Sequence, residues 1–581
     1  MQKKIVLAMM IGVALRAGAG LAQDAAATDV RVRELITQLT HDDPHQRVAA
    51  ADALARMGEA ARPAVRPMLE AMVGKSAWVD FSLMDGLADL GPVALPTLIE
   101  VFDKGPANLR APAGRALWTM GHGAKDAIGV LERVSKDESA PKNIQALAAN
   151  ALQKVRSELA ERSVEVAQPP EMPPFAKVAT LPGAGEWPAF QGPGRDSICR
   201  EGNLLREWPE QGPPLLWKLE GLGKGLSNIA IAGGHIFTMG ERDNKQYALC
   251  YDLAGRKELW AVEVGTKYEY GPLSTPTVDG ERVYVLSTDG TVFCLAVADG
   301  KVLWQRDLVK EFGGKMMCVW KYSESLLVDG GRLLCTPGGP KAMMAALDKT
   351  TGGTLWQCEM PAIGDLGADG AGYSSPVAAE IAGVRQYVNI VGRGAVGVEA
   401  ATGKFLWGYN RIACKIANIT HPVVHGDFVF VTNSYNTGSA LLRVKRQDAT
   451  WKTQEVYFLA RRKFENHHGG VVVVNGAVYG GSGLDRGEPT CVDFATGRIH
   501  WKAKAPSSGS ASVLYANGDL IFRYDRGLVV LAEATPREFR IKGKFQAPTG
   551  DGPAWVHPVV HDGKLYLRHS DLLLCYDLKD S

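Results

Sequence analysis

The sequence lacks a net charge of either sign, and it lacks any long hydrophobic run. Its 581 residues include 65 basic and 63 acidic side chains, which leaves a formal net charge of +2. A balance this even provides no electrostatic footprint for nucleic acid or for an anionic membrane surface. No segment is apolar enough over a sufficient length to cross a bilayer. The composition therefore predicts neither nucleic-acid binding nor a membrane span.

Adjacent cysteines are also missing, as is the C-x-x-C-H motif of haem attachment. The nine cysteines are Cys199, Cys250, Cys294, Cys318, Cys335, Cys358, Cys414, Cys491 and Cys575. Cys250, Cys294, Cys491 and Cys575 occupy the same place in a repeated motif, which favours a small buried hydrophobic role. The sequence assigns no disulfide pairing. A glycine-rich phosphate loop, a nucleophile elbow and an H-E-x-x-H motif are absent as well, so no catalytic residue is predicted.

The N-terminus has the pattern of a secretory signal peptide over residues 1–22. Lys3 and Lys4 precede an apolar run from Ile5 to Leu15, and Gly20-Leu21-Ala22 forms a small-x-small cleavage site. The apolar run is too short to span a bilayer, and no cysteine follows the cleavage site to carry a lipid. We therefore expect a periplasmic or secreted protein.

Residues 29–158 predict an α-helical domain, because apolar residues recur at helical spacing. Leu54–Gly58 recurs as Leu87–Gly91 and as Leu117–Gly121, at intervals of 33 and 30 residues. Each glycine is expected to end one helix in a left-handed conformation, after which a second helix folds back. Pairs this short must stack on their neighbours to bury their apolar faces. The pattern resembles short HEAT-like repeats, which implies an α-solenoid.

Residues 159–186 contain Gln168-Pro-Pro-Glu-Met-Pro-Pro174 and little periodicity, which predicts a stiff, extended linker. From Trp187 to residue 581 the sequence changes to short strands and turns. Strands that end at an aromatic residue recur, and the successive aromatics are Trp260, Trp304, Trp356, Trp407, Trp451, Trp501 and Phe545. Their intervals of 44, 52, 51, 44, 50 and 44 residues suit four strands with three turns.

The final repeat is incomplete, and this indicates how the domain closes. Leu572–Asp577 begins the motif, but the sequence ends at Ser581 before any tryptophan. An unassigned strand, Leu215-Leu-Trp217, lies upstream of the first repeat. Pairing it with the C-terminal strands would remove the exposed edges of the sheets. We therefore predict an all-β, eight-bladed β-propeller closed by its two ends.

The recurring pattern Ala-x-Asp-x-x-Thr-Gly-x-x-x-Trp resembles the tryptophan-docking motif of the pyrroloquinoline-quinone-like (PQQ-like) propeller superfamily. Trp187–Asp196 and Asn466–Gly470 also resemble segments of exported proteins of this class. The resemblance covers residues 187–581 and implies a fold like that of quinoprotein alcohol dehydrogenases. It implies that each tryptophan packs against the next blade. Members include quinoprotein dehydrogenases and the propeller subunit of the outer-membrane assembly machine, so the fold leaves the function open.

The dehydrogenases of this superfamily hold PQQ between a tryptophan and a ring of two adjacent cysteines, with calcium polarising the quinone. Here the adjacent cysteines are absent. Asn433, Asn418 and Glu324 offer oxygen atoms, but no motif assigns them to calcium. The tryptophans are better explained by packing, and PQQ with calcium remains the alternative cofactor set.

A polar site at the central funnel is a second hypothesis, because the starts of the innermost strands converge around the propeller axis. The candidate ligand-binding residues there are Trp320, Tyr322, Glu324, Tyr373, Arg393, Asn418, His421, Asn433, His467, His468, Arg523, Trp555, His557 and Arg568. Such a rim suits a polar ligand with a stackable face, for example a sugar or a quinoid ring.

Histidine is a good metal ligand, but adjacent strand residues point to opposite faces, so His467 and His468 cannot easily chelate one ion together. We predict no metal site and expect the histidines to bond backbone groups. The sequence as a whole predicts an exported binding or scaffold protein whose partner is another protein or a carbohydrate-like molecule. The alternative is a PQQ-dependent oxidoreductase acting on an alcohol or a sugar.

Overall fold

The computed structural model describes residues 28–42, 44–73, 77–161, 170–179, 185–460 and 463–580. The predicted signal peptide, residues 1–22, lies outside them. The chain divides into two compact units, Met1–Ala167 and Gln168–Ser581, and each is described here by itself. No helix in the described part of the chain combines the length and the apolar character that a membrane span requires.

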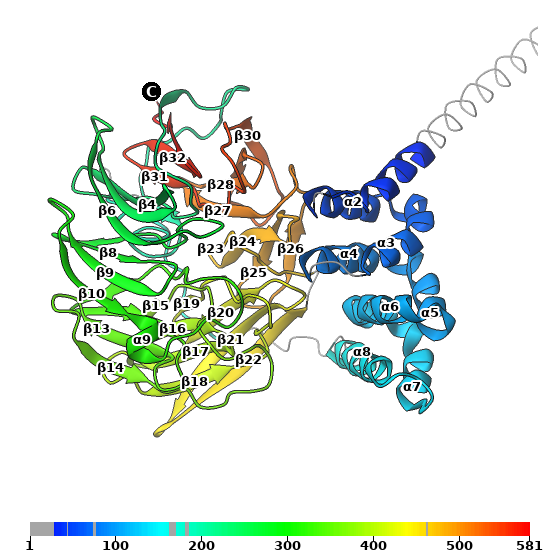
Figure 1. Ribbon diagram of the computed structural model, residues 1–581. Helices are drawn as coiled ribbons and strands as arrows, with labels where there is room; N and C mark the ends of the chain where they lie inside the picture. The colour runs from blue at the N-terminus through cyan, green and yellow to red at the C-terminus, as the bar shows by residue number, and fades with distance from the viewer. Residues whose placement is uncertain are drawn as a thin grey trace, which may run out of the picture. The chain divides into compact units, whose positions relative to one another are not determined.

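The first unit is helical, as predicted. Residues 28–38 form a helix. The elements that follow are α2 (Pro44–Arg56), η1 (Gly58–Ala64), α3 (Val65–Ala71), α4 (Ala77–Asp89), η2 (Gly91–Val93), α5 (Leu95–Lys104), α6 (Ala107–Met120), η3 (Gly121–Ala127), α7 (Ile128–Lys136) and α8 (Lys142–Glu161). Within this unit α2, α4, α6 and α8 form one row, and α3, α5 and α7 form a second (Figure 1).

The three repeated glycines have the conformation that the sequence predicted. Gly58, Gly91 and Gly121 have φ values of +56°, +53° and +53°, which glycine adopts without steric cost. Each lies where one helix ends and a short 3₁₀ turn begins. Successive pairs then pack, because α2 contacts α4, α4 contacts α6, and α6 contacts α8. One continuous core results, and it includes Leu54, Leu87 and Leu117.

The second unit is an eight-bladed β-propeller, as predicted (Figure 1). The strands of blade 1 are β3 (Ala230–Ala232), β4 (His235–Arg242), β5 (Lys245–Asp252) and β6 (Glu258–Thr266). Blade 2 contains β7 (Thr277–Asp279), β8 (Arg282–Leu286), β9 (Thr291–Ala296) and β10 (Val302–Asp307), which leads into helix α9 (Leu308–Phe312). Blade 3 contains β11 (Leu327–Asp329), β12 (Arg332–Cys335), β13 (Met344–Asp348) and β14 (Thr354–Cys358). Blade 4 contains β15 (Val377–Ile381), β16 (Val384–Val391), β17 (Gly394–Glu399) and β18 (Phe405–Tyr409).

The remaining blades follow the same antiparallel order. Blade 5 contains β19 (Val423–His425), β20 (Phe428–Asn433), β21 (Gly438–Gln447) and β22 (Thr450–Ala460). Blade 6 contains β23 (Val471–Val474), β24 (Ala477–Ser482), β25 (Glu488–Asp493) and β26 (Ile499–Lys502). Blade 7 contains β27 (Ala511–Ala516), β28 (Asp519–Tyr524), β29 (Leu528–Glu533) and β30 (Ile541–Gln546), and β1 (Ile198–Cys199) joins it in parallel. Blade 8 contains β31 (Val559–His561), β32 (Lys564–His569), β33 (Leu572–Asp577) and β2 (Leu215–Leu219).

The ring closes as the sequence predicted. Strand β2 pairs antiparallel with β33, with Leu215 opposite Tyr576 and Trp217 opposite Cys575. The last blade therefore takes its outer strand from the start of the domain, and this strand completes the four-stranded sheet. Cys250, Cys294, Cys491 and Cys575 are fully buried and unbridged, which confirms their predicted packing role.

The repeated tryptophans join neighbouring blades. The indole of Trp260 donates to the carbonyl of Val297 in blade 2 at 2.9 Å, and Trp304 donates to Lys349 in blade 3 at 3.2 Å. Gly300 has φ of +73°, and a Cβ there would lie 2.8 Å from the Trp260 ring. The turn glycines Gly300, Gly352 and Gly403 are thus the surfaces on which the indoles of the preceding blades pack.

Blade 5 departs from the predicted pattern. Tyr457, not Trp451, makes the contact with blade 6, where its hydroxyl donates to the carbonyl of Phe494 at 2.9 Å. The ring of Tyr457 also packs on Gly497, the turn glycine of that blade. Trp451 lies near the start of the long strand β22, where the Arg446 guanidinium lies 5.7 Å from the centroid of its ring. The prediction that Trp451 ends the strand of this blade is therefore wrong.

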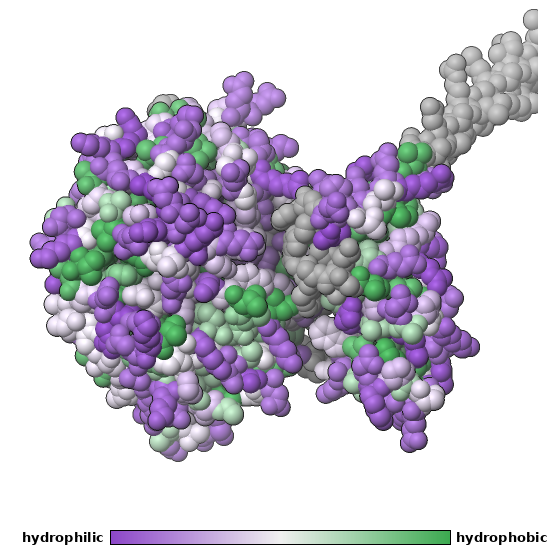
Figure 2. Space-filling view, in the orientation of Figure 1, coloured by the Kyte–Doolittle hydropathy of each residue, from purple (hydrophilic) through white to green (hydrophobic). Residues whose placement is uncertain are grey.

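Part of the predicted linker packs on the propeller. Residues 170–179 are extended, and the imidazole of His425 bonds the carbonyl of Pro173 at 2.7 Å. The Phe175 ring stacks on His425 with 3.7 Å between centroids and meets Phe494 edge-on at 5.2 Å. This segment therefore belongs to the propeller unit. In the view of Figure 2, hydrophilic residues cover much of the propeller surface and hydrophobic residues form small patches.

Candidate functional site

A segment of the chain itself, residues 187–199, fills the propeller axis. We call it the axial segment. Trp187 forms an antiparallel bridge with Ile231 in β3, and the carbonyl of Pro188 accepts from Val278 in β7 at 2.8 Å. The segment then leaves as β1, which pairs in parallel with β27, with Ile198 opposite Tyr515. It therefore touches the innermost strands of blades 1, 2 and 7.

The centre of the axial segment is tightly held. The guanidinium of Arg195 donates to the carbonyls of Ser325 at 2.7 Å and Leu326 at 3.0 Å, at the start of β11. Gln191 is 1% exposed, and its amide nitrogen lies 3.4 Å from Nδ1 of His557. Gln191 and Arg195 both have positive φ, at 60° and 50°, a conformation that non-glycine residues adopt only when contacts hold them there. These contacts hold the axial segment against the loops that precede the innermost strands of blades 3 and 8.

Two predicted histidines face this segment. The ring of Phe190 lies 6.0 Å from that of His421 and 5.3 Å from that of His557. His557 donates from Nε2 to the carbonyl of His468 at 3.0 Å. Burial lowers the pKa of His421 to about 3 and that of His557 to about 4. Both imidazoles are therefore neutral at physiological pH and belong to the packing of the axis.

Beyond the axial segment, partly exposed aromatic rings gather in the loops that precede the innermost strands. Because each blade is an antiparallel meander, these loops and the turns between second and third strands lie at the same end of the propeller. We call this group the funnel recess, and its members are Tyr268, Tyr270, Trp320, Tyr435, His468 and Trp555. It unites three predicted residues with three that the sequence did not single out.

Ring contacts connect the members of the funnel recess. Trp555 stacks on His468 with 4.0 Å between centroids and on Tyr270 at 6.2 Å. Tyr270 lies 5.9 Å from Tyr268. On the other side, Trp320 meets the buried ring of Tyr373 edge-on at 5.9 Å. Trp320, Tyr373 and Tyr435 belong to one apolar cluster, so Trp320 and Tyr435 are connected by packed side chains.

A row of polar groups borders the funnel recess. The Tyr435 hydroxyl lies 3.0 Å from Nε2 of His467, and Nδ1 of His467 lies 2.8 Å from Oγ of Ser510 and 3.5 Å from Oδ1 of Asp485. The backbone N–H of Ser510 donates to Oδ2 of Asp525 at 2.9 Å. Burial, followed by the charge of Asp485, raises the pKa of Asp525 to about 8. Asp525 is therefore protonated at neutral pH, and Ser510 connects it to His467.

Several predicted site residues are instead structural. Arg568 is fully buried and donates to the carbonyls of Ser227 at 2.7 Å and Met239 at 2.6 Å, which joins blade 8 to blade 1. Arg523 donates to the carbonyl of Val556 at 2.8 Å, which joins blade 7 to blade 8. Burial lowers the pKa of each guanidinium to about 10.

Two further predicted residues belong to the interior of blade 3. The Tyr322 hydroxyl donates to the carbonyl of Pro337 at 2.8 Å, and burial raises the pKa of this phenol. The carboxylate of Glu324 accepts from the backbone N–H of Thr336 at 2.8 Å. Burial raises the pKa of Glu324 to about 7, and the neighbouring charge of Arg195 opposes that rise. Glu324 thus complements the axial segment.

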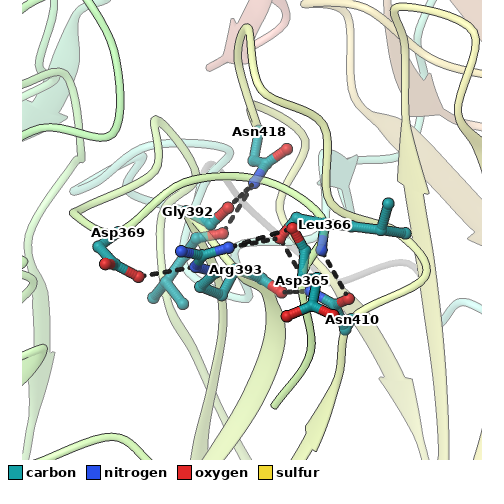
Figure 3. A network of polar contacts seen from close by, with 8 residues as sticks. Asp365, Leu366, Asp369, Gly392, Arg393, Asn410 and Asn418 are labelled. Carbon is teal, nitrogen blue, oxygen red and sulfur yellow. Dashed lines mark hydrogen bonds and ion pairs between the residues drawn. The ribbon is translucent and has the colours of Figure 1, made fainter. Parts of the chain in front are cut away.

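Arg393, Asn418 and Asn433 hold loops in place. Arg393 pairs with Asp369 at 2.7 Å, and Asn418 donates to the carbonyls of Val391 at 2.8 Å and Gly392 at 3.1 Å (Figure 3). Asn433 donates to Oδ1 of Asn418 at 2.6 Å. These side chains are engaged with one another and with backbone, and they line no common ligand position.

The residues present do not fit the calcium site of a quinoprotein. The three predicted oxygen donors, Glu324, Asn418 and Asn433, are occupied by the hydrogen bonds given above. Across the described ranges, no group of three or more His, Cys, Asp or Glu side chains is arranged to hold a metal ion. The donor set therefore provides no carboxylate-rich cage of the kind that calcium requires.

The sequence contained a signal for the two aspartates that was overlooked. Asp485-Arg-Gly487 recurs as Asp525-Arg-Gly527, each in the turn between the second and third strands of its blade. A charged tripeptide at one register position in consecutive blades predicts neighbouring carboxylates around the axis. Tyr268, Tyr270 and Tyr435 carried no comparable signal, because their loops differ in length from blade to blade.

The second unit is an eight-bladed β-propeller that resembles the PQQ-like propellers. A model of the family described as "PQQ_2: Outer membrane protein assembly factor BamB" matches residues 244–503. No curated protein matches the chain.

Solved structures with a similar fold include BamB from Moraxella catarrhalis, which is 12% identical with a TM-score of 0.46 and covers 63% of this chain and 100% of that one. A europium-containing methanol dehydrogenase is 12% identical, with a TM-score of 0.48 and coverage of 66% and 89%. The quinohemoprotein alcohol dehydrogenase from Comamonas testosteroni is 12% identical, with a TM-score of 0.48 and coverage of 68% and 81%. Because one fold hosts unrelated functions, likeness at this level assigns no ligand, partner or activity.

Proposed function

We propose that this chain is an exported binding protein and that the funnel recess binds a polar, carbohydrate-like ligand. The observation that carries the proposal is a set of partly exposed, mutually packed aromatic rings above an axis that the chain has already filled. Export rests on the signal-peptide pattern of residues 1–22. In this proposal the propeller is a rigid frame that presents loop side chains.

The chemistry of the recess suits a sugar. Aromatic faces pack against the apolar C–H faces of a sugar ring, while the Tyr435 and Asp525 side chains offer hydrogen-bonding groups beside them. The net charge of +2 in 581 residues provides no strong field for an ionic ligand. A neutral or weakly charged ligand with a flat apolar face therefore matches the recess better than a highly charged one.

The alternative of a PQQ-dependent oxidoreductase has less support. It needs a slot along the axis with converging oxygen donors, whereas the axial segment occupies that position and Glu324, Asn418 and Asn433 are engaged elsewhere. A protein partner is the other alternative, and the broad faces of a propeller would suit one. The stacked rings of the recess favour the small polar ligand.

The test is a binding measurement on the purified full chain with soluble hexasaccharides of glucose, xylose, N-acetylglucosamine and galacturonic acid. Calorimetry and tryptophan fluorescence should detect binding of at least one of them. Trp555→Phe should keep part of the affinity, and Trp555→Ala should weaken it by about two- to tenfold, because an aromatic contact is worth roughly 0.5–1.5 kcal/mol.

Trp451→Ala is the matched control, because Trp451 is a partly exposed tryptophan on an outer strand of blade 5. Its loss should leave binding unchanged. Binding that Trp555→Ala leaves unchanged, or failure of all four hexasaccharides to bind, would overturn the proposed function.

A further inference from the structure

The outer hairpin of blade 5 extends beyond the sheet to which it belongs. The pairing of β21 with β22 continues as far as Gln447 opposite Thr450. The inner neighbour β20 stops earlier, at Phe428 opposite Arg443. Beyond Arg443 the hairpin therefore continues as two strands alone, and we call residues 443–452 the basic hairpin (Figure 1). Two strands without a third are only marginally stable, so packing within the sheet does not explain this extension.

The basic hairpin concentrates positive charge in a chain whose net charge is close to zero. Its cations are Arg443, Lys445, Arg446 and Lys452. Lys445 lies directly opposite Lys452 in the register, and like charges in that arrangement destabilise a pair of strands. None of the four cations forms a salt bridge with any residue that the structure describes. In blade 1, by contrast, Lys245 of β5 pairs with Glu263 of β6 at 2.7 Å.

A pocket of about 380 Å³ lies beside the basic hairpin. All four cations line it, together with Val444, Gln447, Ala382 and Asp427. Ala382 and Asp427 belong to the turns between the first and second strands of blades 4 and 5. Oδ1 of Asp427 already accepts from the backbone N–H of Ala382 at 2.7 Å. Four cations and one carboxylate give this lining a formal charge of +3.

The cations of the pocket retain N–H groups that a ligand can use. The Arg443 guanidinium lies 5.5 Å from the centroid of the Phe428 ring, which orients it without using its donors. Nε of Arg446 donates to the carbonyl of Asp448 at 3.1 Å. Lys445 and Lys452 are exposed, and within the described ranges their ammonium groups have no hydrogen-bond partner. Such groups are the strong donors to anionic oxygen atoms.

The turn of blade 5 is also free of the packing task that other blades give to this turn. Gly352 and Gly403 lie in the corresponding turns of blades 3 and 4 and receive the indoles of the preceding blades. Trp407 of blade 4 donates instead to Oε1 of Gln386 in its own blade at 2.8 Å. Blade 5 thus carries cations at a position where other blades carry a docking glycine.

We propose that the pocket of the basic hairpin binds a phosphate-bearing anion that carries several negative charges. The charge of the lining matches such a ligand, and guanidinium and ammonium groups are preferred partners of phosphate oxygen atoms. The pocket volume lies in the range of small-molecule sites, which suits a chain of phosphoryl groups or a phosphorylated headgroup. The turns that form it lie at the end of the propeller opposite to the funnel recess, so this site does not depend on the proposed carbohydrate site.

The experiment offers the full chain two sources of the same phosphate chemistry. Calorimetry measures the binding of sodium tripolyphosphate. Co-sedimentation measures binding to vesicles of phosphatidylglycerol, with vesicles of phosphatidylcholine as the comparison without net charge. Raising the salt concentration from about 0.1 M to about 1 M should weaken binding in either arm, because salt screens charges at the surface.

Replacing the two opposed lysines tests the site directly. Lys445→Gln combined with Lys452→Gln should weaken binding by about tenfold or more, because each hydrogen bond to a charged group contributes to affinity. Lys257→Gln combined with Lys301→Gln is the matched control. These two exposed lysines lie in the corresponding turns of blades 1 and 2, so the same charge is removed elsewhere. The control should change the affinity by less than about twofold.

A charge reversal separates loss of the ligand from loss of the fold. Lys452→Glu places a carboxylate opposite Lys445, so attraction replaces repulsion between the two strands. This variant should unfold at the same urea concentration as the unaltered chain or at a higher one. It should nevertheless lose anion binding, because the lining loses two units of positive charge.

The outcomes distinguish the two sources and the failure of the proposal. Binding of tripolyphosphate that the double lysine variant loses supports a soluble polyanion. Binding confined to phosphatidylglycerol vesicles, and lost in the same variant, supports a lipid phosphate. Absence of binding in both arms overturns the proposal. Equal binding to both kinds of vesicle, or equal losses in the double variant and its control, also overturns it.

Discussion

The guanidinium of Arg195 donates to the carbonyl oxygen of Ser325 at 2.7 Å, across a sequence separation of 130 residues. This bond fixes the axial segment to the start of blade 3. The same guanidinium also bonds Leu326 and lies near the buried carboxylate of Glu324, whose pKa its charge lowers against the effect of burial. The filled axis thus depends on a buried charge that is fully engaged.

Replacing Arg195 by leucine should destabilise the propeller by about 3–5 kcal/mol, because two buried carbonyls lose their donor and Glu324 loses its neighbouring charge. Urea unfolding of the purified chain measures the change. Arg200→Leu is the control in the same segment, since Arg200 pairs with Asp196 at the surface and should cost less than about 1 kcal/mol. Equal losses in the two variants would contradict the role given to Arg195.

Trp356 tests the packing of one blade on the next. Its indole donates to the carbonyl of Ala400 at 3.1 Å, and its ring covers Gly403, the turn glycine of blade 4. Trp356→Ala should cost about 3–5 kcal/mol of unfolding free energy, because it leaves a cavity between two blades. Trp451→Ala should cost less than about 1 kcal/mol, since that ring is partly exposed. A Trp356 variant as stable as the Trp451 variant would refute this account.

The closure of the ring can be tested by a cross-link. Trp217 lies directly opposite Cys575 in the antiparallel pair of β2 and β33, so a cysteine at 217 would meet a native thiol. Trp217→Cys should form a disulfide to Cys575 under mild oxidation, and the oxidised form should unfold at higher denaturant than its reduced form. Peptide mapping identifies the bond.

Leu216→Cys is the control for the cross-link, because the register shift between Leu215 and Trp217 leaves position 216 without a partner in β33. It should not bridge to Cys575. A bridge from position 216, or none from position 217, would place β2 in another register.

The blade count was predictable because it depends on a local repeat. In most blades an indole in the fourth strand and a glycine in the turn before it are visible in the sequence, and the indoles of Trp260, Trp304 and Trp356 each bond the next blade. Blade 5 shows the limit of this reasoning, since Tyr457 replaces the expected indole and the long β22 displaces Trp451. Hydrophobic spacing alone does not distinguish those two rings.

The candidate site was less predictable, because its parts come from distant loops. The sequence placed Trp320, His467, His468 and Trp555 at the funnel, and they do lie at the recess or beside it. It gave no indication that the axial segment fills the axis, since Trp187–Asp196 by itself has only the composition of a loop. The sequence placed Arg568 near the axis as well. The alternation of residues along a strand predicts the face of the sheet on which a side chain lies, but it does not predict the hydrogen-bond partners of that side chain.

The buried histidine His421 should make the stability of the propeller sensitive to acid. Its folded pKa is about 3, below its value in the unfolded chain, so between about pH 4 and pH 6 the unfolded state binds one more proton at this residue than the folded state. The stability it contributes is complete above the unfolded pKa and is lost as the pH falls. The corresponding slope is about 1.4 kcal/mol per pH unit.

His421→Gln cannot be protonated, so its unfolding free energy should rise less steeply with pH over this range, by about that amount. Urea titrations at a series of pH values measure the two slopes. His235→Gln serves as the control, because the side chain of His235 is partly exposed at the start of β4. If His421→Gln and the unaltered chain have parallel pH profiles, His421 is not neutral in the folded propeller and the packing described for the axis is wrong.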